Sequence, residues 1–206
     1  MFWNKVARLY DLFEITYNKK VYKGTGIKVA DFINAEDEVL ECACGTGAIS
    51  VSIAPNCRKL IATDYSEGML KQTKKKLASY NNVKVEPADI TALHYADNSF
   101  NKVVAGNVIH LLPNPKSALD ELFRVCKPGG KLIIPTYIYT SQYSNKFEIG
   151  FIQLLGFKHH RKFTEESYKE FFSSYGIDNA QYYIVNGRMP CDIAVISVEK
   201  WHRCKY

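Results

Sequence analysis

Between residues 38 and 138, short apolar runs alternate with amphipathic segments, and this alternation restricts the fold more than any other feature of the sequence. Short Val-, Ile- and Leu-rich runs predict strands, whereas apolar residues at three- and four-residue steps predict helices. The predicted strands are 38–42, 59–64, 83–87, 100–106 and 131–138, and the predicted helices are 46–54, 66–79 and 114–126. Such alternation produces a parallel sheet with helices on both faces, a doubly wound α/β fold.

The segments that flank this core carry different patterns. Residues 2–34 predict helices, because apolar side chains from Trp3 to Tyr17 recur on one face. The remaining predicted elements are helices over 142–156 and 164–176 and two alternating strands, 181–186 and 192–198, around Gly187. These two strands predict a closing antiparallel hairpin, so the whole sheet is expected to have seven strands and to be mostly parallel.

Length and composition predict a single domain. The chain has 206 residues, of which 47% are hydrophobic, and this supports one substantial core. No repeat, low-complexity tract or linker divides it. We therefore predict one domain over 1–206, made of N-terminal helices (1–35), a central core (38–138), further helices (140–175) and a closing hairpin (181–199).

Charge, cysteine content and hydropathy exclude several classes of function. The formal net charge is +6, but the 27 basic and 21 acidic residues are interspersed, so no nucleic-acid partner is expected. The six cysteines lack the paired spacing of a zinc site and are predicted to be reduced thiols, with no metal bound. No run approaches the ~18 apolar residues of a membrane span, so we expect no membrane insertion and a cytoplasmic location. Both a monomer and a homodimer stay open.

Three strand ends carry an acid. The stretch VLECACGTGA places Glu41 just before the glycine turn of Gly45 and Gly47, Asp64 ends the second predicted strand, and Asp89 follows the third. In an open parallel sheet, ligands bind beyond the carboxyl ends of the strands, so these acids are expected to share one pocket.

The chemistry of these acids indicates the ligand. The carboxylate of Asp64 can accept hydrogen bonds from both hydroxyls of a ribose diol. A pyrophosphate needs helix amides and a cation, and the acid at Glu41 would oppose it. S-adenosylmethionine fits better, because it has a ribose diol, an adenine amine, an ammonium and a sulfonium, and no phosphate.

The sequence around these acids resembles a known family. It is similar to the class I S-adenosylmethionine-dependent methyltransferases, and within them to the group of ubiquinone/menaquinone C-methyltransferases. The matching segments, in order, are VLECACGTG (39–47), ATDYSEGML (62–70), ADI (88–90), NVIHLLPNP (107–115) and LFRVCKPGGKLII (122–134). An ordered series of this kind is far more specific than a lone glycine signature. It implies a Rossmann-like fold whose N-terminal helices form a lid over the cofactor.

The resemblance also implies roles for individual residues. The residues expected at the cofactor are Glu41, Ala43, Gly45 and Gly47 on the methionine and ribose side, Asp64 at the ribose, Tyr65 and Met69 beside the adenine, Ala88, Asp89 and Ile90 in the adenine motif, and Asn107 near the methionine. Asp89 is expected to accept from the adenine amine. Tyr10, Tyr17 and Tyr22 are candidate lid residues. The chain departs from the family at Ala43 and Cys126, and an alanine at position 43 predicts an ordinary backbone conformation there.

The expected reaction is in-line transfer of a methyl group from the sulfonium of S-adenosylmethionine to a small-molecule acceptor, which leaves S-adenosylhomocysteine. Alignment of the acceptor does most of the catalysis, so no particular side chain is obligatory. His110 is the candidate general base, although packing at a helix start explains a histidine there equally well. The acceptor is expected between the N-terminal helices and residues 140–175.

Two other functions stay open. One is a nicotinamide-dependent oxidoreductase, against which stand Glu41 and the lack of a glycine at the third fingerprint position. The other is a module that binds a nucleoside without catalysis, because methyl transfer leaves only a light signature in the sequence.

Overall fold

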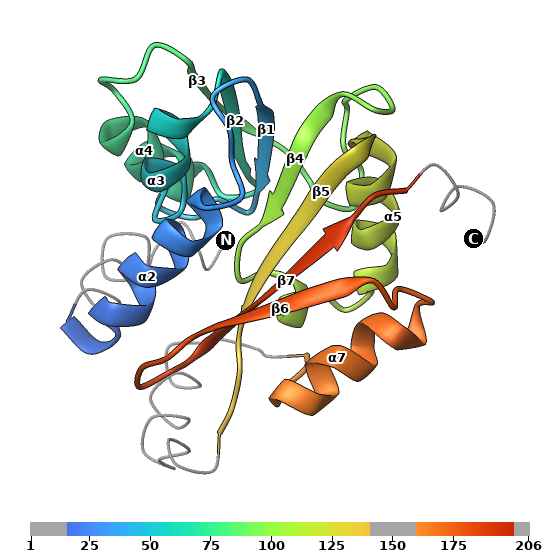
Figure 1. The fold of residues 1–206 in the computed structure, drawn as a ribbon. Coiled ribbons are helices and arrows are strands. Elements are labelled where there is room, and N and C mark those ends of the chain that lie inside the picture. Colours follow the sequence, from blue (N-terminus) through green and yellow to red (C-terminus); the bar gives the residue numbers. More distant parts are fainter. Residues whose placement is uncertain (1–15, 141–159, 200–206) are drawn as a thin grey trace.

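The computed structural model describes residues 16–140 and 160–199. At its centre lies a seven-stranded sheet with the strand order β3-β2-β1-β4-β5-β7-β6 (Figure 1). The strands are β1 Glu38–Cys42, β2 Lys59–Asp64, β3 Val83–Pro87, β4 Phe100–Ala105, β5 Cys126–Tyr137, β6 Ala180–Val185 and β7 Cys191–Ser197. Strands β1 to β5 are parallel, and β7 is antiparallel to both of its neighbours. The predicted mostly parallel α/β fold with a closing hairpin is confirmed.

Helices pack on both faces of this sheet and create two separate cores. The described helices are α2 Lys19–Ala30, α3 Ser50–Ile53, α4 Glu67–Lys76, α5 Pro115–Val125 and α7 Glu165–Ser174, with short 3-10 turns η1 Ala54–Asn56 and η2 Ile109–Leu111. Side chains of α5 and α7 join one core, and those of α2, α3 and α4 join the other. Along β1, Val39 enters the second core and Leu40 the first, as the alternation of a strand requires.

The strand order reverses between β1 and β4. After β3 the chain crosses back over the sheet to pair β4 with the free edge of β1, so the connections after β1 and β4 leave in opposite directions along the sheet. In a doubly wound sheet this switch point is where the loops leave room for a ligand. The predicted positions of the acids therefore fall beside the opening that the topology creates.

Two predicted elements of the core differ from the structure by more than three residues at one end. The helix expected over 46–54 is a turn up to Ile49, one short helix (α3) and the 3-10 turn η1 with Pro55, because the left-handed Gly45 and Gly47 delay the helical conformation. Strand β5 begins at Cys126, whereas the predicted strand begins at residue 131. Gly129 donates to the carbonyl of Val198 and Val198 donates to that of Gly130 (2.7 and 3.0 Å), so these residues pair with the extension of β7.

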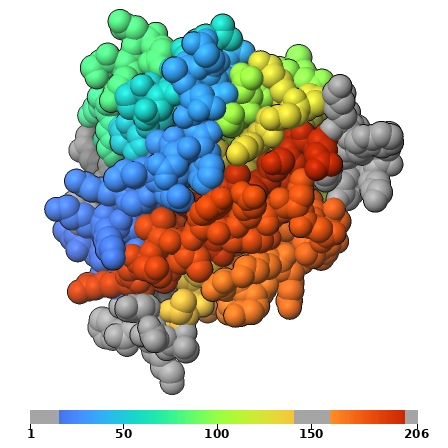
Figure 2. Space-filling model, viewed as in Figure 1, coloured from blue at the N-terminus to red at the C-terminus, as the bar shows by residue number. Residues whose placement is uncertain are grey.

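The N-terminal helix α2 is seated against the closing hairpin, and Figure 2 shows the two segments side by side. The side-chain amide of Asn18 donates to the Met189 carbonyl (3.1 Å) and accepts from the Met189 amide (3.3 Å). A Cβ at Gly24 would lie 2.7 Å from Cγ1 of Val185, so the glycine permits this close approach. The expected helices over 2–15 and 142–156 lie outside the described residues.

Within residues 16–140 and 160–199, no helix is long and apolar enough to cross a membrane.

Candidate active site

A cavity of about 330 Å³ lies beyond the carboxyl ends of β1, β2 and β4. Its described lining consists of Ala43, Gly45, Asp64, Tyr65, Ser66, Met69, Ala88, Asp89, Ile90, Gly106, Asn107, Val108, Leu111 and Leu112. Nine of the residues that the sequence predicted at the cofactor are in this lining: Ala43, Gly45, Asp64, Tyr65, Met69, Ala88, Asp89, Ile90 and Asn107. The structure thus brings together residues from four separate loops, whose roles towards a ligand stay predictions.

The turn after β1 is built from left-handed residues, with φ of +56° at Gly45 and +83° at Gly47. Ala43 also has a positive φ of +53°, so the expectation of an ordinary backbone there was wrong. A left-handed alanine costs roughly 1–2 kcal/mol. The surrounding hydrogen bonds hold the turn in place, because the next residue, Cys44, donates to the Thr63 carbonyl (2.8 Å).

Gly47 does not contribute to the described lining of this cavity. A Cβ at this position would lie 3.2 Å from Cγ2 of Thr73 on α4, so the glycine serves a close contact between the turn and a helix. The predicted contact of Gly47 with a cofactor therefore stays a prediction, whereas its packing role is evident.

Asp64 ties two walls of the cavity together. Its Oδ2 accepts from the amide of Gly45 (2.9 Å) and its Oδ1 from the amide of Ser66 (2.8 Å), which links the glycine turn to the end of β2. Burial raises the pKa of Asp64, and these amide bonds oppose the shift. Each carboxylate oxygen can accept more than one hydrogen bond, so capacity remains for a diol.

Glu41 faces a second, smaller hollow of about 50 Å³ on the other side of the glycine turn. Tyr22 and Thr25 of α2 cover it, and Asn107 and Tyr137 complete one side. Glu41 is 1% exposed and accepts a 2.5 Å hydrogen bond from the hydroxyl of Ser50.

The carboxyl of Glu41 has an unusual protonation equilibrium. Burial raises its pKa from 4.5 to about 8, the hydrogen bond from Ser50 opposes the shift, and the nearby charge of Asp64 adds to it. Two acids thus lie close together, both with a raised pKa. A positively charged group between them would favour the ionised form of both.

Asp89 and Tyr65 stand at the outer end of the cavity. Oδ1 of Asp89 accepts from the amide and the hydroxyl of Thr91 (2.8 and 2.6 Å), so part of the carboxylate caps its own turn. Tyr65 is 64% exposed although it is aromatic, and Met69 beneath it is buried. An exposed aromatic face beside an acid suits a flat ring that carries an amine.

Asn107 and His110 follow β4 but differ in where they lie. Asn107 has a φ of +50° and lines both hollows. His110 is 6% exposed, and its Nδ1 lies 2.9 Å from the hydroxyl of Thr136 on β5. It is absent from the described lining of both hollows, whereas the neighbouring Leu111 lines the larger one. A catalytic role for His110 stays a prediction without a described contact with the cavity.

Two of the three candidate lid residues lie among the described residues. Tyr22 covers the smaller hollow, Tyr17 lies under the guanidinium of Arg188 (5.3 Å), and Tyr10 is outside the described residues. The lining residues to which the sequence analysis gave no role are Thr25, Cys44, Thr46, Ala48, Ile49, Ser66, Gly106, Val108, Leu111, Leu112 and Tyr137. Nine of these lie just after β1, β2 or β4, and that position was a usable signal; Thr25 and Tyr137 gave none.

Comparison with known proteins agrees with this arrangement. Residues 40–134 match the family model described as a methyltransferase domain. A demethylmenaquinone methyltransferase of Clavibacter sepedonicus is 38% identical over 100 residues, which are 48% of this chain and 41% of that protein. The match thus spans about two fifths of the relative's length.

Solved structures show the same fold over a larger share of the chain. An S-adenosylmethionine-dependent methyltransferase of Thermotoga maritima covers 96% of this chain and 99% of its own, with a TM-score of 0.73 and 17% identity. Magnesium protoporphyrin IX methyltransferase of Synechocystis, solved with bound S-adenosylhomocysteine, covers 87% of this chain and 86% of its own, with a TM-score of 0.65 and 16% identity. The core of the chain is thus similar in sequence to a methyltransferase domain, and its fold is similar to those of solved S-adenosylmethionine-dependent methyltransferases.

Proposed function

We propose that the protein transfers a methyl group from S-adenosylmethionine to a small-molecule acceptor. The observation that carries this proposal is the gathering of Ala43, Gly45, Asp64, Asp89 and Asn107 around one cavity at the switch point of the sheet. These residues belong to the segment that matches the methyltransferase model, so fold, site and family favour the same reaction.

The charges of the site support this cofactor. Asp64 suits a ribose diol, and Asp89 with the exposed ring of Tyr65 suits an adenine. Glu41 lies near Asp64, and burial raises the pKa of both carboxyls, which a cationic ligand would reverse. The ammonium and sulfonium of S-adenosylmethionine supply positive charge on this side, and the bound sulfonium provides the activated methyl carbon.

The same geometry disfavours a nicotinamide dinucleotide. The amide of Gly45 is already hydrogen-bonded to Asp64, so it is not directed at a phosphate. The helix after the turn has only four residues and begins at Ser50, which leaves no extended helix N-terminus to hold a pyrophosphate. Both features weaken the oxidoreductase alternative.

The chain's contribution to the reaction would be alignment. The two hollows meet at Ala43, Gly45, Gly106 and Asn107, so the left-handed turn and the start of the β4 loop would orient the sulfonium. The apolar side chains of Val108, Leu111 and Leu112 face the larger cavity and would exclude water from the transfer. The hydroxyl of Thr136 holds His110 beneath this loop, where it would need a relay to take a proton from an acceptor.

The acceptor is expected between the N-terminal helices and residues 140–175, much of which lies outside the described residues. The curated relatives are demethylmenaquinone methyltransferases, which supports a small organic acceptor. A cytoplasmic location stays a prediction. The matched residues lie in the cofactor half, so they favour the reaction class and leave the choice among carbon, nitrogen, oxygen and sulfur acceptors to experiment.

Calorimetric titration with S-adenosylmethionine, S-adenosylhomocysteine and NAD tests the proposal. We expect micromolar binding of the two sulfur compounds and no measurable binding of NAD. The opposite preference would overturn the proposal. Binding of S-adenosylmethionine without methyl transfer to any of a panel of small acceptors would favour the nucleoside-binding module.

A further inference from the structure

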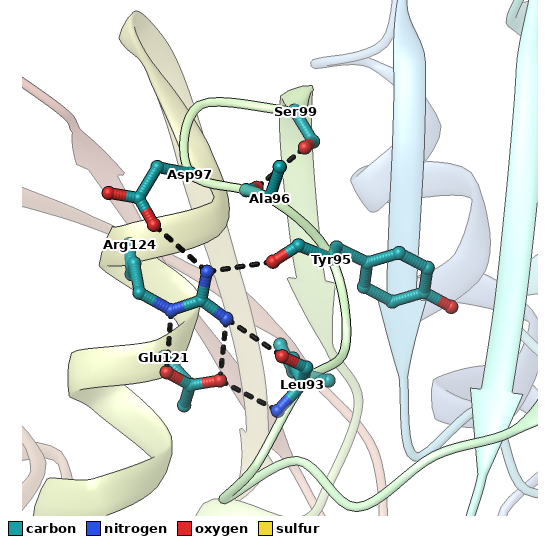
Figure 3. Close-up of polar contacts among 7 residues, drawn as sticks. All are labelled: Leu93, Tyr95, Ala96, Asp97, Ser99, Glu121 and Arg124. Atoms are coloured by element: carbon teal, nitrogen blue, oxygen red, sulfur yellow. Dashed lines mark hydrogen bonds and ion pairs between the residues drawn. The ribbon is translucent and has the colours of Figure 1, made fainter.

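Arg124 joins helix α5 to the loop between β3 and β4, and Figure 3 shows its guanidinium surrounded by oxygen atoms. Its Nε donates to Oε1 of Glu121 (2.7 Å), Nη1 to the Tyr95 carbonyl (2.7 Å) and Oδ1 of Asp97 (3.0 Å), and Nη2 to the Leu93 carbonyl (2.8 Å) and Oε2 of Glu121 (2.8 Å). All five N–H groups of the guanidinium are therefore used. A lysine could not reproduce this planar arrangement.

Glu121 and the end of α5 complete the attachment. Oε2 of Glu121 also accepts from the amide of Leu93 (2.6 Å), and the hydrogen bonds from Arg124 lower the pKa of Glu121. The amides of Asn98 and Ser99 donate to the carbonyls of Arg124 and Val125 (2.9 and 2.8 Å). The position of the whole second half of the loop thus follows the position of α5.

The first half of the same loop lines the larger cavity through Ala88, Asp89 and Ile90. Asp89 caps the turn that runs directly into the attached part, because its side chain accepts from Thr91 and its carbonyl accepts from the amide of Ala92 (3.0 Å). The next residue, Leu93, is bound to both Glu121 and Arg124. No strand or helix separates Asp89 from this attachment.

We propose that Arg124 is a positioning residue for the nucleobase end of the cofactor. It does not line the described cavity, and it acts by holding the loop so that the carboxylate of Asp89 meets the adenine amine. This inference rests on the proposed function, and it identifies a specificity determinant outside the pocket.

The preference for a ligand that carries the adenine amine can be measured, and it does not depend on the overall stability of the protein. S-Adenosylhomocysteine carries an exocyclic amine that can donate to Asp89, whereas S-inosylhomocysteine carries a carbonyl oxygen at that place. The wild-type protein is expected to prefer the adenosyl compound by at least tenfold, the size of one charge-assisted hydrogen bond. A protein whose loop is loosened should lose the preference, and a protein that is merely less stable should keep it.

The test compares Arg124→Lys with the control Lys116→Met by calorimetry on both compounds. Lys116 lies on the same helix and pairs with Asp120 at 2.8 Å. Arg124→Lys should reduce the preference for S-adenosylhomocysteine by about tenfold, while Lys116→Met and Asp97→Ala, which removes one of the five bonds, should stay within about twofold of wild type.

A folded Arg124→Lys protein that keeps the wild-type preference would overturn the inference. If that variant does not fold, Glu121→Gln is the second variant, and retention of the full preference there would have the same consequence. Failure of the wild-type protein to bind S-adenosylhomocysteine would instead overturn the proposed function, so the two failures can be told apart.

Discussion

The two walls of the larger cavity are held in place in different ways. The turn after β1 is fixed locally, by left-handed residues and by the hydrogen bond that the Gly45 amide donates to Asp64 at the end of the adjacent strand. The loop after β3 is fixed from a distance, by the side chains of Glu121 and Arg124 on α5. The first wall therefore depends on the ends of two neighbouring strands, both of which lie in segments that the sequence marks, whereas the second depends on a helix that is more distant in the chain.

The strongest test of the locally fixed wall is Asp64→Ala. The substitution removes the acceptor for the Gly45 amide and the expected acceptor for the ribose diol. Each charge-assisted hydrogen bond is worth about 1.5–3 kcal/mol, so loss of two should lower the affinity for S-adenosylhomocysteine more than a hundredfold. Calorimetry measures the loss, and circular dichroism should show an unchanged fold. Asp120→Ala, at an exposed ion pair on α5, is the matched control and should bind normally.

Gly47→Val tests whether the same wall depends on close packing. The φ of +83° and the contact with Thr73 on α4 are both unfavourable for a valine, and together they should cost about 2–3 kcal/mol of unfolding free energy. Chemical denaturation measures this. A valine variant as stable as wild type would show that the turn tolerates a side chain and that only a ligand contact could explain the glycine. Gly45→Ala, where a Cβ meets nothing within 4 Å, isolates the cost of the backbone conformation.

The strands of the locally fixed half could be predicted from the sequence. Strands 38–42, 59–64 and 83–87 occur at the predicted bounds, because the first two are short apolar runs and the third alternates apolar and polar residues. The convergence of Asp64 and Asp89 follows as well, since the carboxyl ends of neighbouring parallel strands meet at one edge. Ser66, the first residue of the predicted helix 66–79, caps α4 by accepting from the amide of Met69 (3.3 Å).

Features that depend on distant contacts could not be predicted. Lys127–Gly130 have the composition of a turn, but their backbone groups pair with Val198, which the local sequence does not reveal. His110 faces Thr136 because of the way η2 packs on β5, and no periodicity defines the faces of a single 3-10 turn. The bonds of Arg124 to the β3–β4 loop belong to the same class, because their partners are widely separated in the chain.

Glu41→Gln tests the electrostatics of the locally fixed wall. The unfolded chain releases the Glu41 proton above about pH 4.5, while the folded chain keeps it up to about pH 8. The stability from this carboxyl is therefore full at low pH and is lost as the pH rises towards 8. We expect the wild-type protein to lose about 1–2 kcal/mol more than the glutamine variant between pH 5.5 and 8, measured by urea denaturation. Parallel curves for the two proteins would contradict a raised pKa.

The smallest expected effect concerns Ala43, for which the sequence predicted an ordinary backbone conformation that the structure does not have. Its φ of +53° is a conformation that an alanine adopts at a cost of roughly 1–2 kcal/mol and a glycine adopts freely. Glycine also loses more chain entropy on folding, which offsets part of the gain. Ala43→Gly should therefore stabilise the protein by about 0.5–1 kcal/mol in chemical denaturation, with the affinity for S-adenosylhomocysteine nearly unchanged. The exposed Ala78→Gly, just beyond the end of α4, is the control and should give no gain. A loss of stability at position 43 would mean that the methyl group of Ala43 contributes packing that outweighs the backbone strain, and the turn would then be held by side chains in the same manner as the opposite wall.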